Sequence, residues 1–264
     1  MGILRVHPVA SESEPGVSKV HQADVLIVGG GPVGLCLAMD LARRGVECLV
    51  VERRHVGEPP SVKCNHVSSR TMETFRRLGF ADVVRAAGLP DDYPNDVVLR
   101  TRATGYELTR IHIPCRRDRF TDTSGPDGWW PTPEPPHRIN QIFLEPVLAT
   151  NAAAMPGVTI VHRTEFRGFE QDIEGVTAHA HDLDTGDELT LRAAYLIGCE
   201  GGRSLVRRAI GAKLIGDEVI QRVQSSYIRA RDLIERVTKP DAWMSYLYNP
   251  LRAGNLVAID GRET

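Results

Sequence analysis

The chain has 264 residues, of which 42% are hydrophobic and 25% charged, a composition typical of a globular protein with one or two packed cores. Its 32 Lys and Arg residues against 34 Asp and Glu give a net charge of -2, which excludes the broad positive field of a nucleic-acid or anionic-membrane binder. The most apolar stretch, residues 25–39, is interrupted by glycines and is too short for a span of about 20 residues, so no membrane association is expected.

The cysteines and the first residues indicate where the protein is found. The five cysteines are odd in number, scattered along the chain, and never spaced as a metal or redox pair. We therefore expect reduced thiols, a cytoplasmic protein and no metal site. Residues 1–22 lack the apolar core of a signal peptide and are predicted to form a flexible arm.

The first predicted unit combines a strand, a helix and a second strand. Residues 24–28 are nearly all apolar and end in glycines, which is typical of a strand buried on both faces of a parallel sheet. Residues 33–43 repeat apolar positions at helical spacing, with Pro32 suited to the first turn and Gly45 to the stop. Residues 48–51 give the second strand and complete a βαβ unit.

The rest of the chain alternates further helices and strands. We expect a helical pair over residues 68–87, sheet over 97–113, a helix over 141–154, a strand over 158–162, antiparallel hairpins over 168–191, a buried strand over 194–198, a short helix over 205–210, and mixed strands over 219–230 and 243–259. The proline-rich segment 125–136 carries Trp129 and Trp130. It is interpreted either as a surface loop with its aromatic side chains tucked in or as a lid over a substrate.

The segment from Gly29 to Gly34 reads GGGPVG and fits the pattern G-x-G-x-x-G. That pattern alone is a weak signal, but here it follows a predicted buried strand and opens a predicted helix, which is the context of a dinucleotide site. Gly29 permits the tight turn, Gly31 lets a pyrophosphate approach the backbone, and Gly34 allows close packing of helix on strand. The amide groups at the helix start, around Pro32 and Val33, then face the phosphates.

Glu52 follows the second predicted strand, 18 residues after Gly34. A carboxylate at this place can accept hydrogen bonds from both hydroxyl groups of a ribose, which disfavours a 2′-phosphate. The bound dinucleotide is therefore expected to be FAD or NAD(H) rather than NADP(H).

Residues 24–53 resemble the opening of the class A flavoprotein monooxygenases, the group of para-hydroxybenzoate hydroxylase and phenol 2-monooxygenase. Glu52 and Arg53 are similar to the acidic residue and the adenine-side arginine of that family. Val62-Lys63-Cys64 with residues 69–73 resembles a stretch whose first basic residue reaches toward the flavin, with Lys63 in place of an arginine. The resemblance implies that FAD is the cofactor.

Two later segments extend the resemblance to nearly the whole chain after residue 24. Gln141, at the start of the pattern Q-x-x-L-E-x-x-L, is similar to a glutamine that touches FAD in the family; the alternative is an exposed glutamine at a helix start. Glu200 and Gly201 lie in a stretch similar to the second fingerprint of the family, near the pyrophosphate, where aspartate is usual.

The resemblance implies an α/β fold: a Rossmann-like FAD-binding domain over residues 23–214 with a parallel sheet and antiparallel insertions near 97–113 and 168–191, then the beginning of a mixed-sheet substrate domain over 215–264. It implies an enzyme that uses FAD, NAD(P)H and O₂ to hydroxylate an aromatic, phenolic small molecule. The third fingerprint of the family, a Gly-Asp pair that holds the ribityl chain, is not found before Thr264, so a fragment of a longer enzyme is expected.

Several alternatives stay open at this point. Other FAD-dependent dehydrogenases, oxidases or halogenases share the first fingerprint, although Trp129-Trp130 does not fit the Trp-x-Trp-x-Ile signature of the halogenases. A non-catalytic FAD-binding fragment is the rival outside the enzymes. No catalytic acid or base is assigned, since the isolated histidines are expected to be packed or solvated. A homo-oligomer is compatible with the sequence.

Overall fold

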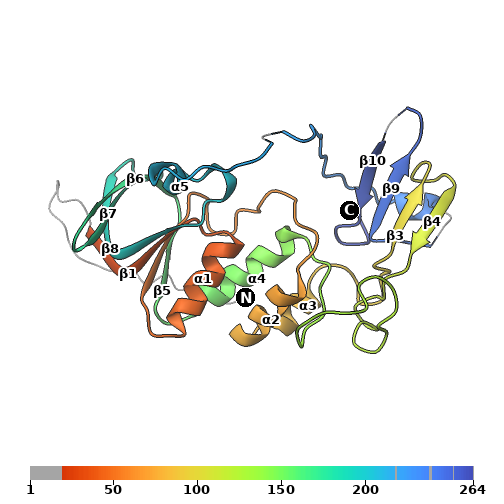
Figure 1. Cartoon of the computed structure of the whole chain (residues 1–264), viewed down its shortest axis with the longest axis horizontal. Helices are drawn as coiled ribbons and strands as arrows, with labels where there is room; N and C mark the ends of the chain where they lie inside the picture. Colours follow the sequence, from red (N-terminus) through yellow and green to blue (C-terminus); the bar gives the residue numbers. More distant parts are fainter. Residues whose placement is uncertain (1–19, 218, 238–239, 252, 264) are drawn as a thin grey trace.

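The computed structural model describes residues 20–217, 219–237, 240–251 and 253–263, so the predicted arm lies almost entirely outside the described residues. A larger lobe is built on a six-stranded sheet in the order β5-β2-β1-β8-β7-β6 (Figure 1). Its strands are β1 (Val20–Val28), β2 (Cys48–Val51), β5 (Val158–Val161), β6 (Thr164–Asp172), β7 (Gly175–Asp182) and β8 (Glu188–Gly198). None of the helices in the described ranges is long and apolar enough to cross a bilayer.

The sheet has a parallel part and an antiparallel part. Strand β1 pairs in parallel with β2 and with β8, and β2 pairs in parallel with β5, while β6, β7 and β8 form an antiparallel meander. The predicted parallel sheet with an antiparallel insertion over residues 168–191 is confirmed. The structure differs at the start of β1, because residues 20–22, predicted as the end of the arm, are strand residues aligned with Thr190, Leu191 and Arg192 of β8.

Strand β1 is apolar on both sides because both of its faces are covered. Val25 and Ile27 pack in one cluster with Ala38 of helix α1 (Pro32–Ala42), whereas Leu26 and Val28 belong to a cluster on the opposite side. That second cluster includes Val206 of the short helix α5 (Leu205–Ala209). The buried strand predicted from residues 24–28 is therefore confirmed, and its carboxyl end delivers the chain directly to the glycine segment.

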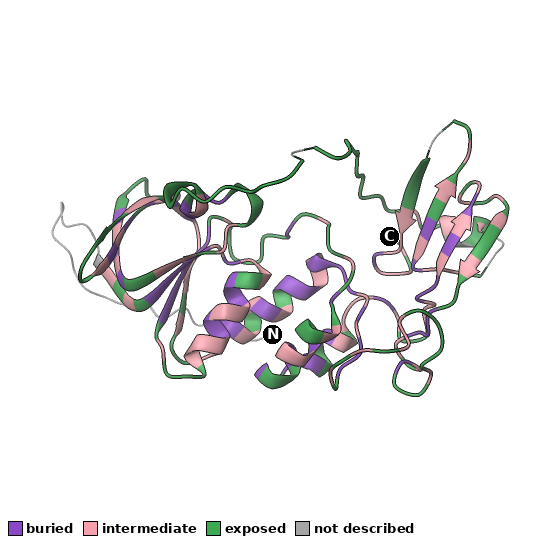
Figure 2. Cartoon of the chain, in the orientation of Figure 1, coloured by how far each residue is buried: buried purple, intermediate pink, exposed green. Residues whose placement is uncertain are grey.

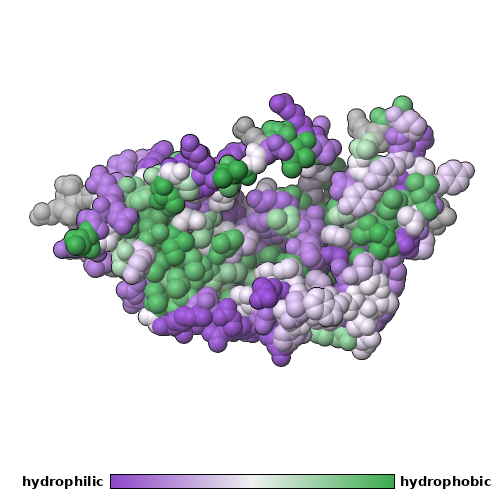
Figure 3. All heavy atoms as spheres, in the orientation of Figure 1, coloured by the Kyte–Doolittle hydropathy of each residue, from purple (hydrophilic) through white to green (hydrophobic). Residues whose placement is uncertain are grey.

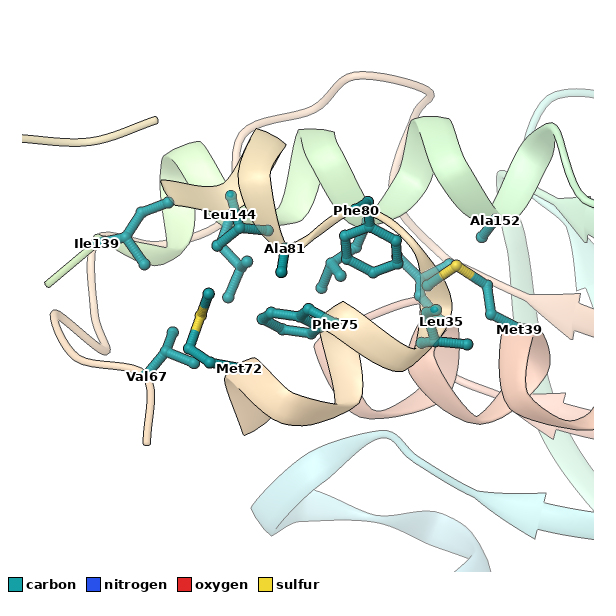
Figure 4. Packing of buried hydrophobic residues seen from close by; sticks show 13 residues of the cluster. Leu35, Met39, Val67, Met72, Phe75, Phe80, Ala81, Ile139, Leu144 and Ala152 are labelled. Atoms are coloured by element: carbon teal, nitrogen blue, oxygen red, sulfur yellow. The ribbon is translucent and has the colours of Figure 1, made fainter. Parts of the chain in front are cut away.

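Helices α1, α2 (Ser69–Leu78), α3 (Ala81–Ala86) and α4 (Gln141–Ala153) share one core (Figure 4). Phe75 of α2 lies at its centre, 1% exposed, with its ring centroid 5.2 Å from that of Phe80. Leu148 of α4 is fully buried in the same cluster. Gly79 ends α2 with a left-handed φ of 94°, which a residue without Cβ adopts at little cost, so the predicted break is confirmed.

A second sheet has the order β10-β9-β3-β4 and contains β3 (Val97–Arg100), β4 (Glu107–Ile111), β9 (Met244–Tyr248) and β10 (Ala253–Val257). Strand β3 pairs in antiparallel with β4 and in parallel with β9. Residues 97–113, predicted as an insertion in the FAD-binding domain, contain strands β3 and β4, and β3 pairs with the late strand β9. Local alternation predicts a strand but does not identify its partner, which here lies about 150 residues away in the sequence.

Two expected strands are not as predicted. Residues 219–230 form no strand in the described structure. They belong to an exposed connection that runs from α5 to the second sheet (Figure 2), and helix α6 (Leu233–Arg236) lies further along the same connection. This connection leaves apolar side chains in solvent, since Ile220 is 90% and Val223 74% exposed. Figure 3 shows hydrophobic and hydrophilic residues mixed on this face of the molecule. Residues 194–198, predicted as a separate buried strand, are the end of β8, where Tyr195 is 69% exposed. An apolar run indicates a strand, but burial also requires an element that covers it.

Candidate functional site

The glycine segment joins the end of β1 to the start of α1, and each of its glycines has a different environment. Gly29 has a φ of 106°, and a Cβ added there would lie 2.7 Å from the carbonyl oxygen of Cys199. A Cβ added at Gly34 would lie 2.0 Å from the carbonyl oxygen of Gly29. A Cβ added at Gly31 would meet no protein atom within 4 Å. Gly29 and Gly34 are thus required by the protein itself, whereas the space over Gly31 is open to a ligand.

Helix α1 begins at this open space without a competing cap. Its N-cap residue is Gly31, which has no side chain to accept the first amide groups, and no acidic residue lies in its first turn. Pro32 occupies the first helical position, and Val33 is 69% exposed. The first amide groups of a helix lack intrahelical partners, and the helix dipole favours an anion beside them. The segment therefore fits a phosphate group of a dinucleotide.

Glu52 lies immediately beyond β2 and turns its carboxylate toward the glycine segment. Its Oε2 accepts a hydrogen bond from the N–H of Gly30 at 2.8 Å, and its Oε1 accepts one from the N–H of Arg54 at 2.9 Å. The residue is 8% exposed. Burial alone would raise its pKa, but the hydrogen bonds from Arg54 and Gly30 outweigh burial and hold the pKa of Glu52 below its usual value. An ionised carboxylate has about four acceptor sites, and Nε and Nη2 of Arg54 occupy two more of them at 3.2 and 3.4 Å, so a ribose hydroxyl group would take the place of the longest of these contacts.

Arg54, which the sequence analysis did not single out, connects Glu52 to helix α4. Its Nε donates to Oε1 of Glu52 at 3.2 Å, and its Nη1 donates to Oε2 of Glu145 at 2.8 Å. Gln141, one turn before Glu145, donates from Nε2 to Oε1 of the same carboxylate. Gln141 is 7% exposed, so the alternative of an exposed glutamine at the helix start is wrong. A buried polar chain thus joins the second strand to the start of α4.

The side chain of Arg53 pairs with strand β6 and not with Glu52. The Arg53 side chain is 73% exposed, and its Nε lies 3.4 Å from Oε1 of Glu165 on β6. The arginine beside Glu52 is therefore Arg54, and a contact of Arg53 with adenine stays a prediction. Because side chains alternate along an extended chain, a residue two positions after Glu52 falls on the same side, and this spacing is the signal that could have identified Arg54.

Lys63 and Gln141 are brought together by the backbone. The N–H of Gln141 donates to the carbonyl oxygen of Lys63 at 3.2 Å, while the side chain of Lys63 is exposed. The neighbouring Asn65 accepts a hydrogen bond from Asn140, the N-cap residue of α4. The two segments that resembled the flavin-side stretches of the family are adjacent in space, and the contact of Lys63 with a flavin stays a prediction.

The second predicted fingerprint lies beside the first, because β8 and β1 are parallel neighbours and both end at the same edge of the sheet. The N–H of Cys199 donates to the carbonyl oxygen of Val28 at 2.7 Å. Glu200 accepts hydrogen bonds from Leu205 N–H at 2.9 Å and Val206 N–H at 3.1 Å, and thereby caps helix α5. Gly201, with a φ of 81°, begins the short 3₁₀ turn Gly201–Arg203. Glu200 thus has a structural task, and a contact with pyrophosphate stays a prediction.

The cap predicts a measurable stability effect. Glu200→Ala removes the carboxylate that satisfies the first amide groups of α5, so we expect the free energy of unfolding to fall by about 1 kcal/mol in urea denaturation. Glu188→Ala is the matched control, because the Glu188 side chain is 75% exposed and pairs only with His181, and it should change stability by less than about 0.5 kcal/mol. Equal effects of the two substitutions would contradict the capping role.

Comparison with known proteins provides independent information about this site. Residues 22–263 match the family model described as "FAD binding domain". A putative polyketide hydroxylase of Streptomyces halstedii is 33% identical over 92% of this chain and 42% of its own length. The phenol 2-monooxygenase of Pseudomonas sp. (strain EST1001) is 33% identical over 78% of this chain and 33% of its own length.

Solved structures give the same result for the fold. The rebeccamycin biosynthetic enzyme RebC with reduced flavin superposes with a TM-score of 0.75 at 34% identity, over 93% of this chain and 45% of that one. Aklavinone-11 hydroxylase in a complex with FAD and aklavinone gives a TM-score of 0.70 at 30% identity, over 92% of this chain and 44% of that one. The chain therefore spans less than half the length of these relatives.

Proposed function

The chain belongs to the FAD binding domain family of the class A flavoprotein aromatic hydroxylases, and from this premise we propose that it is the FAD-binding part of a monooxygenase that uses NAD(P)H and O₂ to hydroxylate an aromatic, phenolic small molecule. The observation that carries the proposal is the open space over Gly31 at the uncapped start of α1, with the carboxylate of Glu52 beside it. Both features fit FAD at the carboxyl edge of the parallel strands.

The residues of this chain have binding and orienting tasks. The amide groups at the start of α1 would hold the pyrophosphate of FAD, and Glu52 would accept hydrogen bonds from its ribose. Arg54 holds Glu52 ionised and in place, and Gln141 lies on the same polar chain toward the flavin side. Bound FAD would supply the redox and oxygen chemistry, which the protein orients and shields from water.

A cavity beside the second sheet supports an aromatic substrate. It has a volume of about 130 Å³ and lies between the second sheet and α6, with an apolar wall that includes Leu233, Leu256 and Val257. Its polar lining includes Tyr93, Arg100, Asp241, Arg262 and Glu263. A cavity of roughly 150 Å³ accepts one benzene ring in another protein, so this space fits a single aromatic ring.

The five cysteines are all free, which supports a reducing compartment, and we propose the cytoplasm.

The ribose contact is tested by Glu52→Ala. Loss of one or two hydrogen bonds to a charged acceptor, each about 1.5 to 3 kcal/mol, should weaken FAD binding at least tenfold in a fluorescence titration. Glu165→Ala is the control. The Glu165 side chain is partly buried and pairs with Arg53 and Arg167, but it does not contact the glycine segment. Equal FAD affinities in wild type and Glu52→Ala would show that Glu52 is not a ligand of the ribose.

The reaction is tested with isotopically labelled oxygen. Purified protein reconstituted with FAD is supplied with NADH or NADPH, ¹⁸O₂ and a panel of phenols and aromatic polyketides, and any longer product of the same gene is assayed in parallel. We expect one ¹⁸O atom in the hydroxylated product. An oxidised product without ¹⁸O would instead assign the protein to the FAD-dependent dehydrogenases or oxidases.

A further inference from the structure

A second pocket, lined by polar groups, lies between the segment that runs from α3 to β3 and the segment that joins β4 to α4, and none of its lining residues belongs to the glycine segment. Four arginines line it, namely Arg85, Arg116, Arg119 and Arg138. Its other lining residues are Leu89, Pro90, Asn95, Pro136 and His137, so no carboxylate is among the described residues that form its wall. The enclosed volume is about 10 Å³, which is room for one water-sized group.

Aromatic rings fix three of these guanidinium groups. Arg138 stacks over Trp243 with 4.1 Å from Cζ to the ring centroid, Arg119 stacks over Trp130 at 5.1 Å, and Arg85 over Phe120 at 5.2 Å. A stacked aromatic ring covers the flat face of a guanidinium group. The N–H groups at the edge of the guanidinium stay available for hydrogen bonds. Trp130, on the predicted proline-rich loop, is therefore tucked in, whereas Trp129 is 81% exposed.

The positive charges exceed the negative ones around the pocket. Glu134 pairs with Arg85 at 2.7 Å, and Asp127 pairs with Arg138 at 2.7 Å and lies 3.9 Å from Arg119. No carboxylate of the described chain comes within ion-pair distance of Arg116. Glu134 and Asp127 thus serve these four guanidinium groups and also Arg76, whose Nε lies 3.7 Å from Glu134, so positive groups outnumber the nearby carboxylates; Asp122 acts on Arg119 only from a longer distance.

His137 adds no charge to this excess. It is 5% exposed, and its Nε2 lies 3.1 Å from the carbonyl oxygen of Val84. Burial, followed by the neighbouring Arg85 and Arg116, lowers its pKa to about 4, so the ring is neutral near pH 7.

Arg119 gives the most specific indication of a missing partner. Its side chain is 3% exposed, and its Nη2 donates to the carbonyl oxygen of Asp127. Its Nη1 is buried and has no hydrogen-bond partner in the described structure. A buried guanidinium N–H without an acceptor is costly, and it is costlier beside other positive charges.

We propose that this pocket binds a phosphate group. One phosphate oxygen would enter the enclosed space and accept from Nη1 of Arg119, while the other oxygens would stay at the mouth within reach of Arg116 and Arg138. An anion matches the excess of positive groups, and a guanidinium fork matches phosphate geometry. The phosphate comes either from free inorganic phosphate or from a ligand that bears a phosphomonoester, such as the 2′-phosphate of NADPH.

The test measures phosphate binding by thermal shift and calorimetry on the 264-residue chain, with inorganic phosphate, 2′,5′-ADP and 5′-AMP as ligands and sodium chloride and acetate at matched ionic strength. We expect phosphate to stabilise the wild type more than chloride or acetate does. Tighter binding of 2′,5′-ADP than of 5′-AMP would identify a 2′-phosphate ligand, whereas binding of both nucleotides no tighter than that of inorganic phosphate would identify free phosphate. Equal stabilisation by all the anions would overturn the proposal.

Variants distinguish this pocket from the glycine segment. Arg119→Met removes the unpartnered N–H but keeps a long side chain against Trp130, so it should fold and bind phosphate at least tenfold more weakly. Arg117→Met is the matched control, since Arg117 is exposed, lies two positions away and pairs with Asp118. Gly31→Val should leave this phosphate site intact. Undiminished phosphate binding in a folded Arg119→Met variant would overturn the proposal without touching the assignment of the FAD site.

Discussion

Gly31→Val is expected to weaken FAD binding at least a hundredfold, which is about 2.8 kcal/mol, while the free energy of unfolding of the protein without FAD stays nearly unchanged. The backbone of Gly31 has a φ of -80° and a ψ of -175°, a conformation that valine adopts readily. A Cβ at this position meets no protein atom within 4 Å, so the added side chain would extend from the backbone into the space assigned to the pyrophosphate.

Two further glycines make this experiment decisive. Gly168→Val adds the same side chain at an open position in β6, far from the site in sequence, and should leave FAD affinity unchanged. Gly34→Ala places a Cβ 2.0 Å from a backbone oxygen and should instead destabilise the fold itself. FAD affinity in a folded Gly31→Val variant equal to that of the wild type would remove the pyrophosphate assignment.

Arg54→Met is expected to lower the free energy of unfolding by about 2 to 4 kcal/mol. Arg54 is the cation between two buried carboxylates, Glu52 and Glu145, so its loss leaves two uncompensated negative charges. This loss of unfolding free energy is set at or below the usual cost of breaking a buried ion pair, because the Arg54 side chain is 27% exposed and water screens part of its charge. Arg53→Met is the adjacent control and should cost less than about 0.5 kcal/mol, since Arg53 is 73% exposed.

The effect of Arg54→Met should also depend on pH. Because the pKa of folded Glu52 is lowered, its ion pair contributes full stability above the unfolded pKa of about 4.3, and this contribution disappears as the pH falls through the folded value. The stability difference between wild type and Arg54→Met should therefore stay constant from pH 7 to about pH 4.3 and shrink when urea denaturation is continued below that pH, down to about pH 3. A difference that stays constant over the whole range, including below about pH 4.3, would show that Arg54 acts through packing and not through charge.

Features that depend on local geometry could be predicted from the sequence. The turn at Gly29, the close approach at Gly34 and the open position at Gly31 each follow from a glycine between a buried strand and a helix. The position of Glu52 at the end of β2 follows from the length of the same βαβ unit, and its hydrogen bond to Gly30 confirms that the carboxylate faces the glycine segment.

Contacts between distant segments could not be predicted in the same way. Arg54 and Glu145 are 91 positions apart, and no local pattern in either segment indicates the other. The carboxylate of Glu200 had been expected near pyrophosphate, yet its acceptor sites serve the start of α5, a choice that depends on where the chain turns after β8. The partner of residues 97–111 likewise became visible only in the folded chain.

The measurement that tests the central claim most directly is an FAD titration of the purified chain, followed by visible absorbance and by retention of the flavin through gel filtration. If the glycine segment, Glu52 and α4 form an FAD site, the chain takes up one FAD per molecule, the flavin bands shift on binding, and NAD⁺ does not displace the flavin. A folded, colourless chain that takes up no added FAD, or that binds NAD⁺ in its place, would contradict the claim.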